Sequence, residues 1–212
     1  MAASRRTPSE PEVRIFISDL RVETRAEGDT SPAKIVGHAA VFDQWTTLYD
    51  GTYWTWREIV RPGAFRNALA ENQDVVALFN HDRNQVLGRS TSGTLTLRED
   101  ATGLLVEITL PDTQLGRDLA TLVARGDLRG MSFGFKVRAN GEKVTITIQG
   151  EKELEERELL DLDLFDVSVV TRPAYPQTDV SVRSQADVRD RPHRDLWRDR
   201  AHVRLRLAEA QS

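Results

Sequence analysis

Three side chains with the chemistry of acyl transfer occur in separate parts of the sequence. Ser132 lies in "RGMSFGF" (129–135), His81 in "NHD" (80–82) and Asp166 in "LLDLDLFDVSVV" (159–170). A serine hydroxyl becomes a nucleophile when a neutral imidazole takes its proton and an acid fixes the imidazole tautomer. The apolar neighbours of Ser132, taken alone, favour a different role, that of a small polar residue filling a strand. Both interpretations stay open at this point.

The glycines beside Ser132 indicate how negative charge could be stabilised there. Gly130 and Gly134 carry no side chain that would obstruct the approach of an oxyanion to backbone N–H groups, such as those of Phe133 and Gly134. The block G-M-S-F-G lies in a predicted strand that follows a helix, and not at a strand-to-helix turn. The nucleophile elbow of an α/β-hydrolase is therefore disfavoured.

Of the four histidines, His81 is the best candidate for a general base. It follows the apolar run "DVVALF" and has polar neighbours, and catalytic groups often project from such strand ends. His38 lies inside the apolar segment "IVGHAAVF", where we expect a structural histidine. His193 and His202 lie in a charged C-terminal segment.

Asp166 is the preferred partner for His81 among the acids of the last apolar run. In a regular strand Asp166 shares one face with Leu164 and Ser168, whereas Asp161 and Asp163 lie on the opposite face. A carboxylate on a buried face needs a partner, because an isolated buried charge is costly. Asp161 and Asp163 are equally well explained as acids that face water. The third member could also be one of these neighbouring acids, or be absent.

The sequence offers little that could hold a metal ion. It has no cysteine, and "NHD" lacks a second histidine at a metal-binding spacing. We therefore expect no metal and no organic cofactor. A metal-dependent hydrolase that uses His81 and Asp82 is an alternative, and it predicts that a chelator abolishes activity.

Charge and hydropathy argue against two classes of partner. Among 212 residues, 29 Lys and Arg nearly balance 33 Asp and Glu, so the formal net charge is only −4. This balance gives no support for nucleic-acid binding. No apolar run is long enough to span a bilayer, and the first 14 residues lack the apolar core of a secretory signal. We expect no membrane role and a reducing, cytosolic compartment.

Hydrophobic periodicity predicts an α+β fold made mostly of antiparallel strands. Strands are expected at 13–23, 34–42, 56–60 and 74–82, then between 84 and 110 around turns at Ser92-Gly93 and at 100–103, and in three segments between 130 and 171. Turn pairs occur at Asp50-Gly51 and at Asn140-Gly141, and the second predicts a hairpin. Helices are expected at 63–72 and 111–128, the second capped by Asp112.

The ends of the chain differ from its middle in composition. We expect a disordered N-terminal arm at 1–12 and one domain at 13–182. Residues 183–212 are rich in arginine and aspartate, and we expect a charged tail that is flexible or partly helical. Exposed tails are where proteolysis concentrates, so either end could carry a cleavage site or a packaging signal.

In combination, the ordered blocks resemble a known family. The segments "NHD…VLGRSTSGTLTLREDATGLLVEITLPDT", "GRDLATLVARGDLRGMSFGFKV" and "LFDVSVVTRPAYPQT" resemble the HK97-type phage prohead proteases, over about Ile35 to Val182. The resemblance implies a serine endopeptidase of phage head maturation. It also implies a fold similar to that of the herpesvirus assembly proteases, a closed or partly open β-barrel with surrounding helices.

The same resemblance implies roles for individual residues. Ser132 takes the position of the nucleophile and His81 that of the base. Asp166 takes the third position, where the family commonly has glutamate. Related assembly proteases use an arginine near the oxyanion, and Arg129 and Arg172 are the candidates here.

The resemblance implies partners and a place of action as well. The expected substrates are the major capsid protein, through its scaffolding segment, and the protease itself, so self-association is expected. The work is expected inside the assembling prohead, in the host bacterial cytoplasm. The alternative is a non-catalytic capsid-assembly or scaffold protein of the same fold, for which Ser132→Ala leaves the length of the capsid protein unchanged.

Overall fold

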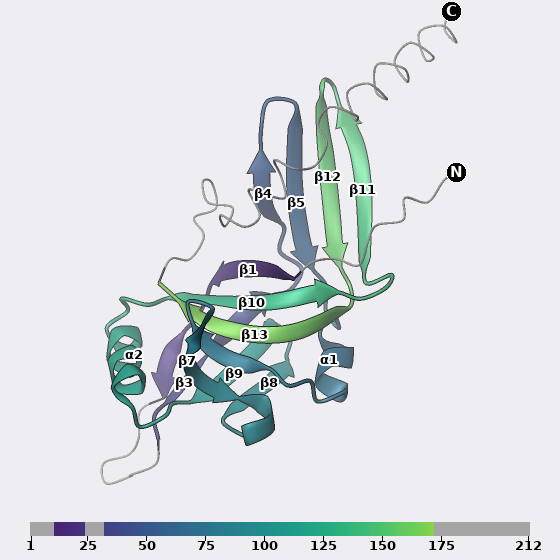
Figure 1. Cartoon of the computed structure of the whole chain (residues 1–212). Helices are drawn as coiled ribbons and strands as arrows, with labels where there is room; N and C mark the ends of the chain where they lie inside the picture. The colour runs from purple at the N-terminus through teal and green to yellow at the C-terminus, as the bar shows by residue number, and fades with distance from the viewer. Residues whose placement is uncertain (1–10, 24–31, 172–212) are drawn as a thin grey trace, which may run out of the picture. The chain divides into compact units, whose positions relative to one another are not determined.

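The computed structural model describes residues 11–23 and 32–171, and the structural statements below refer to these residues. It confirms an α+β fold made mostly of strands (Figure 1). The elements, in chain order, are β1 (Glu12–Ile17), β2 (Arg21–Glu23), β3 (Lys34–Val41), β4 (Thr46–Asp50), β5 (Trp54–Val60), α1 (Arg66–Ala70), β6 (Val76–Phe79), β7 (Asp82–Arg89), the 3₁₀ turn η1 (Ser90–Ser92), β8 (Leu95–Glu99), β9 (Gly103–Thr109), α2 (Gln114–Ala124), β10 (Gly130–Val137), β11 (Glu142–Gln149), β12 (Lys152–Leu159) and β13 (Leu162–Val170).

The described strands form three sheets. Sheet A has the order β1-β10-β13-β6-β7, sheet B the order β2-β3-β9-β8 and sheet C the order β11-β12-β5-β4. Only the β12–β5 and β13–β6 ladders are parallel, so the predicted antiparallel character holds for the other ladders between these strands. Within the described ranges the strands do not close into one barrel, and the predicted closed barrel is not confirmed.

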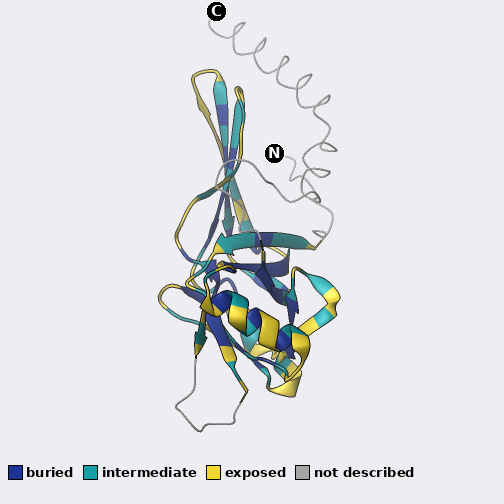
Figure 2. Ribbon diagram, turned by 90° about the vertical axis from the view of Figure 1, so that its left-hand side faces the viewer, coloured by how far each residue is buried: buried dark blue, intermediate teal, exposed yellow. Residues whose placement is uncertain are grey.

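The hydrophobic core is built by sheets A and B together with both helices. It takes side chains from β3, β9, β10 and β13, and from one stripe of each helix. Phe133 of β10 lies at its centre, and its ring centroid is 5.9 Å from that of Phe16, 5.3 Å from Phe65 and 4.9 Å from Phe135. Figure 2 shows α2 with buried residues along one side and exposed residues along the other, as its amphipathic sequence predicts. This core fixes β10 and thereby the segment "RGMSFGF".

Two predicted strand arrangements were wrong. The segment 13–23 is split into β1 and β2, and β1 begins at Glu12, the last residue of the predicted arm. Asn140-Gly141 does form a turn, in which the Gly141 N–H donates to the carbonyl of Arg138, but it does not join neighbouring strands. Both edges of β10 are taken by β1 and β13, so β11 pairs with β12 in another sheet.

The N-cap of helix α2 lies one residue later than the predicted cap. Its N-cap is Thr113, whose side chain accepts a hydrogen bond from the Gly116 N–H at 3.2 Å, and not Asp112. The expected tail at 183–212 and most of the expected arm at 1–12 lie outside the described residues, and the domain boundaries stay predictions. In the part of the chain that the structure describes, no helix is long and apolar enough to cross a membrane.

Candidate active site

Ser132 lies on the central part of sheet A and points away from the core. Because side chains alternate along a strand, Met131, Phe133 and Phe135 enter the core while Ser132 faces the other side of the sheet. Its relative exposure is nevertheless 0%. Other groups therefore cover this side of the sheet at Ser132.

A β-bulge in β13 turns Asp166 towards the same side. In the register with β10, Leu164 and Asp166 have consecutive partners and Phe165 has none, so Phe165 is an inserted residue. The insertion shifts the alternation, and Leu164 and Val167 both enter the core. The prediction that Asp166 shares a face with Leu164 was therefore wrong, because a regular strand was assumed.

Gly134 makes room for the Asp166 carboxylate. The two residues are opposite each other in the β10–β13 ladder. A Cβ atom at Gly134 would lie 2.3 Å from Asp166 Oδ2, which is closer than any real contact. The need for glycine at this position thus has a cause that does not depend on an oxyanion.

His81 is held in a tight turn between β6 and β7. Phe79 pairs with Asp82, so Asn80 and His81 are the two central residues, and their φ angles are 52° and 58°. Positive φ at both positions is the signature of a type I′ turn, which normally has Asn-Gly there. Among the described non-glycine residues with positive φ, all except His81 are Asn or Asp. A histidine in this conformation costs free energy, and such local strain is typical of functional sites.

The turn is anchored to the end of β13. The Asn80 N–H donates to the carbonyl of Val169 at 2.9 Å, and Asn80 Oδ1 accepts from the Thr171 N–H at 3.0 Å. The His81 N–H donates to Ser168 Oγ at 3.2 Å. These contacts fix the backbone of the turn, and with it the direction of the imidazole.

The three candidate residues form a continuous chain of contacts. His81 Nδ1 lies 2.6 Å from Asp166 Oδ1, and His81 Nε2 lies 2.6 Å from Ser132 Oγ. The side chains of His81 and Asp166 are 23% and 20% exposed, whereas Ser132 is fully covered. With the Nδ1 proton donated to Asp166, Nε2 carries the lone pair that can accept the serine proton.

Strand β1 lies beside Ser132 in sheet A. Ser132 Oγ lies 2.7 Å from the carbonyl oxygen of Arg14, to which it can donate a hydrogen bond. A hydroxyl has one proton, so Arg14 and His81 Nε2 compete for it.

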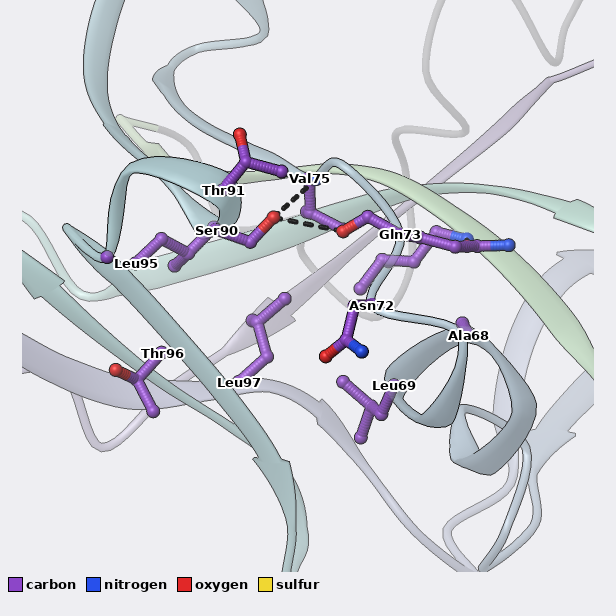
Figure 3. Close-up of a pocket in the computed structure, with 12 residues that line it drawn as sticks. Ala68, Leu69, Asn72, Gln73, Val75, Ser90, Thr91, Leu95, Thr96 and Leu97 are labelled. Atoms are coloured by element: carbon purple, nitrogen blue, oxygen red, sulfur yellow. Dashed lines mark hydrogen bonds between the residues drawn. The ribbon is translucent and has the colours of Figure 1, made fainter.

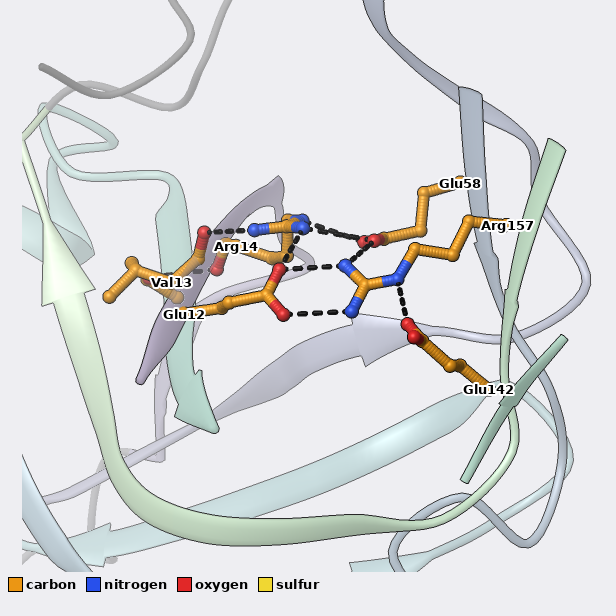
Figure 4. Close-up of polar contacts among 7 residues, drawn as sticks. Glu12, Val13, Arg14, Glu58, Glu142 and Arg157 are labelled. Atoms are coloured by element: carbon orange, nitrogen blue, oxygen red, sulfur yellow. Dashed lines mark hydrogen bonds and ion pairs between the residues drawn. The ribbon is translucent and has the colours of Figure 1, made fainter. Parts of the chain in front are cut away.

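A buried ion-pair network holds β1 in this position (Figure 4). Arg14 Nε donates to Glu58 Oε1 at 2.6 Å, and Arg157 Nη1 donates to Glu58 Oε2 at 2.9 Å and to Glu12 Oε2 at 2.7 Å. Arg157 also pairs with Glu142 at 2.6 Å, so the network joins β1 to β5, β11 and β12 of sheet C. Removing one partner of a buried network of this kind costs about 3–5 kcal/mol, because it leaves a charge unpaired.

The charges of this network dominate the ionisation of Glu12. Its burial would raise the pKa, but the hydrogen bonds and positive charges of Arg157 and Arg14 outweigh it and lower the pKa to about 2. Glu12 therefore stays ionised at all but strongly acidic pH, and the attachment of β1 to sheet C persists over that range.

The four residues named as oxyanion candidates have different surroundings. Phe133 and Gly134 are paired on both edges of β10, so their N–H groups lie in the plane of the sheet. Arg129 Nε donates to the carbonyl of Gly126 at 2.9 Å, next to the end of α2. Arg172 lies outside the described residues. Their oxyanion role stays a prediction.

Asp161 and Asp163 take no part in the contact chain. Asp163 Oδ1 accepts from Arg138 Nε at 2.8 Å and from Gln73 Nε2 at 2.7 Å, and Asp161 Oδ2 accepts from Asn67 Nδ2 at 2.9 Å. Both acids are thus engaged by other side chains, and of the three acids weighed for the third position only Asp166 meets His81.

Among the described residues, no side chains converge on His81 in the way that the metal-dependent alternative requires. Both ring nitrogens of His81 face Asp166 and Ser132, while the Asp82 carboxylate accepts from the Asn84 N–H at 2.9 Å and from Gln85 at 3.0 Å. Across the described ranges, no group of three or more His, Cys, Asp or Glu side chains is arranged to hold a metal ion.

His38 lies in a separate cluster with two acids. Its Nδ1 is 3.0 Å from Asp19 Oδ1 and its Nε2 is 3.0 Å from Asp100 Oδ2. These contacts link the β1–β2 connection to the end of β8, and they fit the expected structural role.

A pocket between α1 and β8 lies apart from the contact chain (Figure 3). Its lining includes none of Ser132, His81 and Asp166. Beside it, Ser90 Oγ donates to the carbonyl of Gln73 and accepts from the Val75 N–H, both at 2.9 Å. Ser90 is thus a second serine that ties a turn to the backbone, and it takes no part in the contact chain.

Comparison with known proteins identifies the family. Residues 19–191 match the family model described as caudovirus prohead serine protease. The chain belongs to this family. It is 31% identical over 180 residues to the prohead protease of Enterobacteria phage HK97, covering 84% of this chain and 72% of that protein. It also aligns with the structure of the bacteriophage T4 capsid assembly protease, with a TM-score of 0.44 and 12% identity over 78% of this chain and 100% of that chain. A likeness at that TM-score does not establish a shared fold.

As a member of the family, the chain is a serine protease of the phage prohead. The resemblance drawn from the ordered sequence blocks is confirmed. Three features of the site had no reliable signal in the sequence: the bulge at Phe165, the contact of the Arg14 carbonyl with Ser132 Oγ, and the contacts of Ser168. The pair Asn80-His81 between two apolar runs did contain a hairpin signal, because asparagine is favoured in type I′ turns.

Proposed function

We propose that Ser132 is the nucleophile, His81 the general base and Asp166 the residue that orients the base. The observation that carries this proposal is the pair of 2.6 Å contacts, from Asp166 to His81 Nδ1 and from His81 Nε2 to Ser132. A buried hydroxyl that only fills a strand has no need of an imidazole held in a strained turn. The arrangement therefore supports peptide-bond hydrolysis through an acyl-enzyme.

The reaction would proceed in two halves. His81 Nε2 accepts the proton of Ser132 as Oγ attacks the scissile carbonyl carbon, and Asp166 stabilises the resulting imidazolium. His81 then returns the proton to the leaving amine as the C–N bond breaks. In the second half, His81 activates a water that releases the acyl group. Arg129 or Arg172, together with the N–H groups of Phe133 and Gly134, are the proposed donors to the oxyanion.

Substrate entry would require β1 to move. Ser132 is buried and its hydroxyl contacts the Arg14 carbonyl of β1, the edge strand beside β10, so displacing β1 would free the Ser132 hydroxyl from that contact. Displacing β1 breaks the ion pairs of Glu12 and Arg14 with sheet C.

The proposed substrates are the scaffolding portion of the phage capsid protein and other copies of this protease. The support is the membership of the prohead protease family and the likeness to the HK97 protein. Self-association would bring one copy within reach of another inside the assembling prohead. Cleavage within the ends of the chain would then be a self-processing event.

The proposal is tested by co-expressing the full chain with its cognate capsid protein and measuring both by intact mass. We expect the wild type to shorten the capsid protein, and Ser132→Ala and His81→Ala to leave it at full length, a loss of about 10³-fold or more in rate. Ser90→Ala is the matched control and should cleave normally, since Ser90 lies by the remote pocket. Cleavage at the same site by Ser132→Ala would refute the assignment of the nucleophile.

A further inference from the structure

Ser168 is a second buried hydroxyl at the site, beside Ser132. The two serines are opposite each other in the β10–β13 ladder, on the same side of sheet A, and each has a relative exposure of 0%. Ser132 contacts only one of the other two members of the proposed catalytic group. Ser168 contacts both.

The contacts of Ser168 use its hydroxyl fully. Ser168 Oγ accepts from the His81 N–H at 3.2 Å and donates to Asp166 Oδ1 at 3.1 Å, and it also lies 3.2 Å from His81 Nδ1. One proton and the lone pairs of a hydroxyl satisfy this set without conflict. The same oxygen atom thus fixes the backbone of the base and the carboxylate that orients it.

The need for such a group follows from the backbone of His81. A histidine with φ of 58° is strained, and an external hydrogen bond to its N–H offsets part of that cost. Asp166 has the complementary need, because the bulge at Phe165 directs its carboxylate away from the core and the ladder does not fix its rotamer. Contact with one atom couples the position of the carboxylate to that of the turn.

We propose that Ser168 is a positioning residue, which holds His81 and Asp166 in the alignment required for proton transfer from Ser132. This inference rests on the proposed function and deepens it. Ser168 does not touch the reacting atoms. It sets the angle and distance of the Asp166–His81 hydrogen bond, and so the fraction of molecules in which His81 Nε2 points at Ser132 Oγ.

The first test measures the reactivity of Ser132 directly. The full-length wild type, Ser168→Ala, Ser168→Thr and Ser90→Ala are treated with a small fluorophosphonate, and the maximal rate of labelling is separated from the probe's apparent affinity. Because β1 is present in all variants, any barrier to entry affects them equally. Ser168→Ala should lose about 10- to 100-fold in maximal rate with unchanged probe affinity, as expected when a hydrogen bond to a charged group is removed.

The controls separate positioning from a general structural role. Ser168→Thr restores the hydroxyl and should recover most of the rate, and Ser90→Ala should react as the wild type does, although it loses a comparable hydroxyl tie between turn and backbone. Unfolding midpoints are measured for every variant. Wild-type labelling by Ser168→Ala, or a loss that Ser168→Thr does not recover while its stability is normal, overturns the inference.

The second test does not depend on activity. In ¹H NMR of ¹⁵N-histidine-labelled protein, the His81 Nδ1–H donated to Asp166 should give a downfield resonance in the wild type and in Ser90→Ala. We expect Ser168→Ala to shift or broaden it, and Ser168→Thr to restore it. An unchanged resonance in Ser168→Ala contradicts the inference. Labelling of Ser132→Ala as fast as the wild type would instead count against the proposed nucleophile, and the NMR comparison would still decide the role of Ser168.

Discussion

Two histidines in this molecule each sit between polar partners, and their surroundings differ in one respect that matters for chemistry. His81 has a carboxylate on Nδ1 and a hydroxyl on Nε2. His38 has carboxylates on both nitrogens, Asp19 on Nδ1 and Asp100 on Nε2. A neutral imidazole satisfies the first arrangement, because it donates on one side and accepts on the other. The second arrangement is satisfied only by an imidazolium, which donates on both sides.

This difference favours His81 over His38 as the general base. An imidazolium at His38 has no lone pair with which to take a proton, whereas a neutral imidazole at His81 has one directed at Ser132. The backbone conformation also differs between the two histidines. His38 is on β3 of sheet B, next to a shift in the register with β9, while His81 has a positive φ in a tight turn. A histidine beside an acid is thus not informative by itself, and the group on its other nitrogen decides its chemistry.

The largest effect is expected when the acid beside His81 is made neutral. Asp166→Asn keeps the size of the side chain but can offer its NH₂ group to His81 Nδ1, which favours the tautomer with the proton on Nε2. We expect a loss of about 10⁴-fold in the rate of cleavage, with little change in stability. The rate is measured by mass spectrometry of the capsid protein. The matched variant Asp100→Asn at His38 should retain full activity, and a comparable loss in that variant would contradict the separation of the two clusters.

A smaller effect, on stability alone, is expected at the other histidine. His38→Ala removes a buried side chain and leaves two partly exposed carboxylates, Asp19 and Asp100, without their shared partner. We expect a decrease of about 1–3 kcal/mol in the free energy of unfolding, measured by denaturant titration, and cleavage at the wild-type rate under conditions where the variant is folded. A loss of cleavage in the folded variant would show that His38 acts in the site.

The same comparison shows how far the sequence could lead. Residue types and local periodicity were sufficient to name Ser132, His81 and Asp166 as candidates and to separate His38 from them. The roles of the three came from the resemblance of the ordered blocks to the family. The face of Asp166 was missed because an inserted residue, Phe165, reverses the alternation and is defined only by the register with β10.

The contact between Arg14 and Ser132 was missed for a related reason. Arg14 precedes it by more than a hundred residues, and the pairing of β1 with β10 depends on long-range packing that local periodicity does not contain. The same holds for the hairpin expected at Asn140-Gly141. The local turn signal predicted the turn correctly, but it contained no information on whether the two strands pair with each other.

The smallest expected effect is a dependence on pH of the stability that the His38 cluster contributes. Burial would lower the pKa of His38, but its hydrogen bonds to Asp100 and Asp19 outweigh it and raise the pKa. Burial would likewise raise the pKa of Asp100, yet the hydrogen bond from His38 and those from the Gly103 and Thr102 N–H groups lower it to about 2. A raised histidine pKa contributes stability that is complete below about 6.5 and is lost as the pH rises through the folded value. A lowered aspartate pKa contributes stability that is present above about 3.9 and is lost as the pH falls towards 2.

The difference in unfolding free energy between the wild type and His38→Ala should therefore be greatest between about pH 4 and 6.5, and should shrink on both sides. Denaturant titrations at pH 5 and at pH 9 measure the alkaline limb. The rate of fluorophosphonate labelling of Ser132, measured in parallel on folded protein, should have the same pH profile in both variants, because His38 does not contact the site. A difference in unfolding free energy that grows from pH 5 to pH 9 would mean that His38 is neutral in the folded protein, and the contrast with His81 would then have to rest on the Ser132 hydroxyl alone.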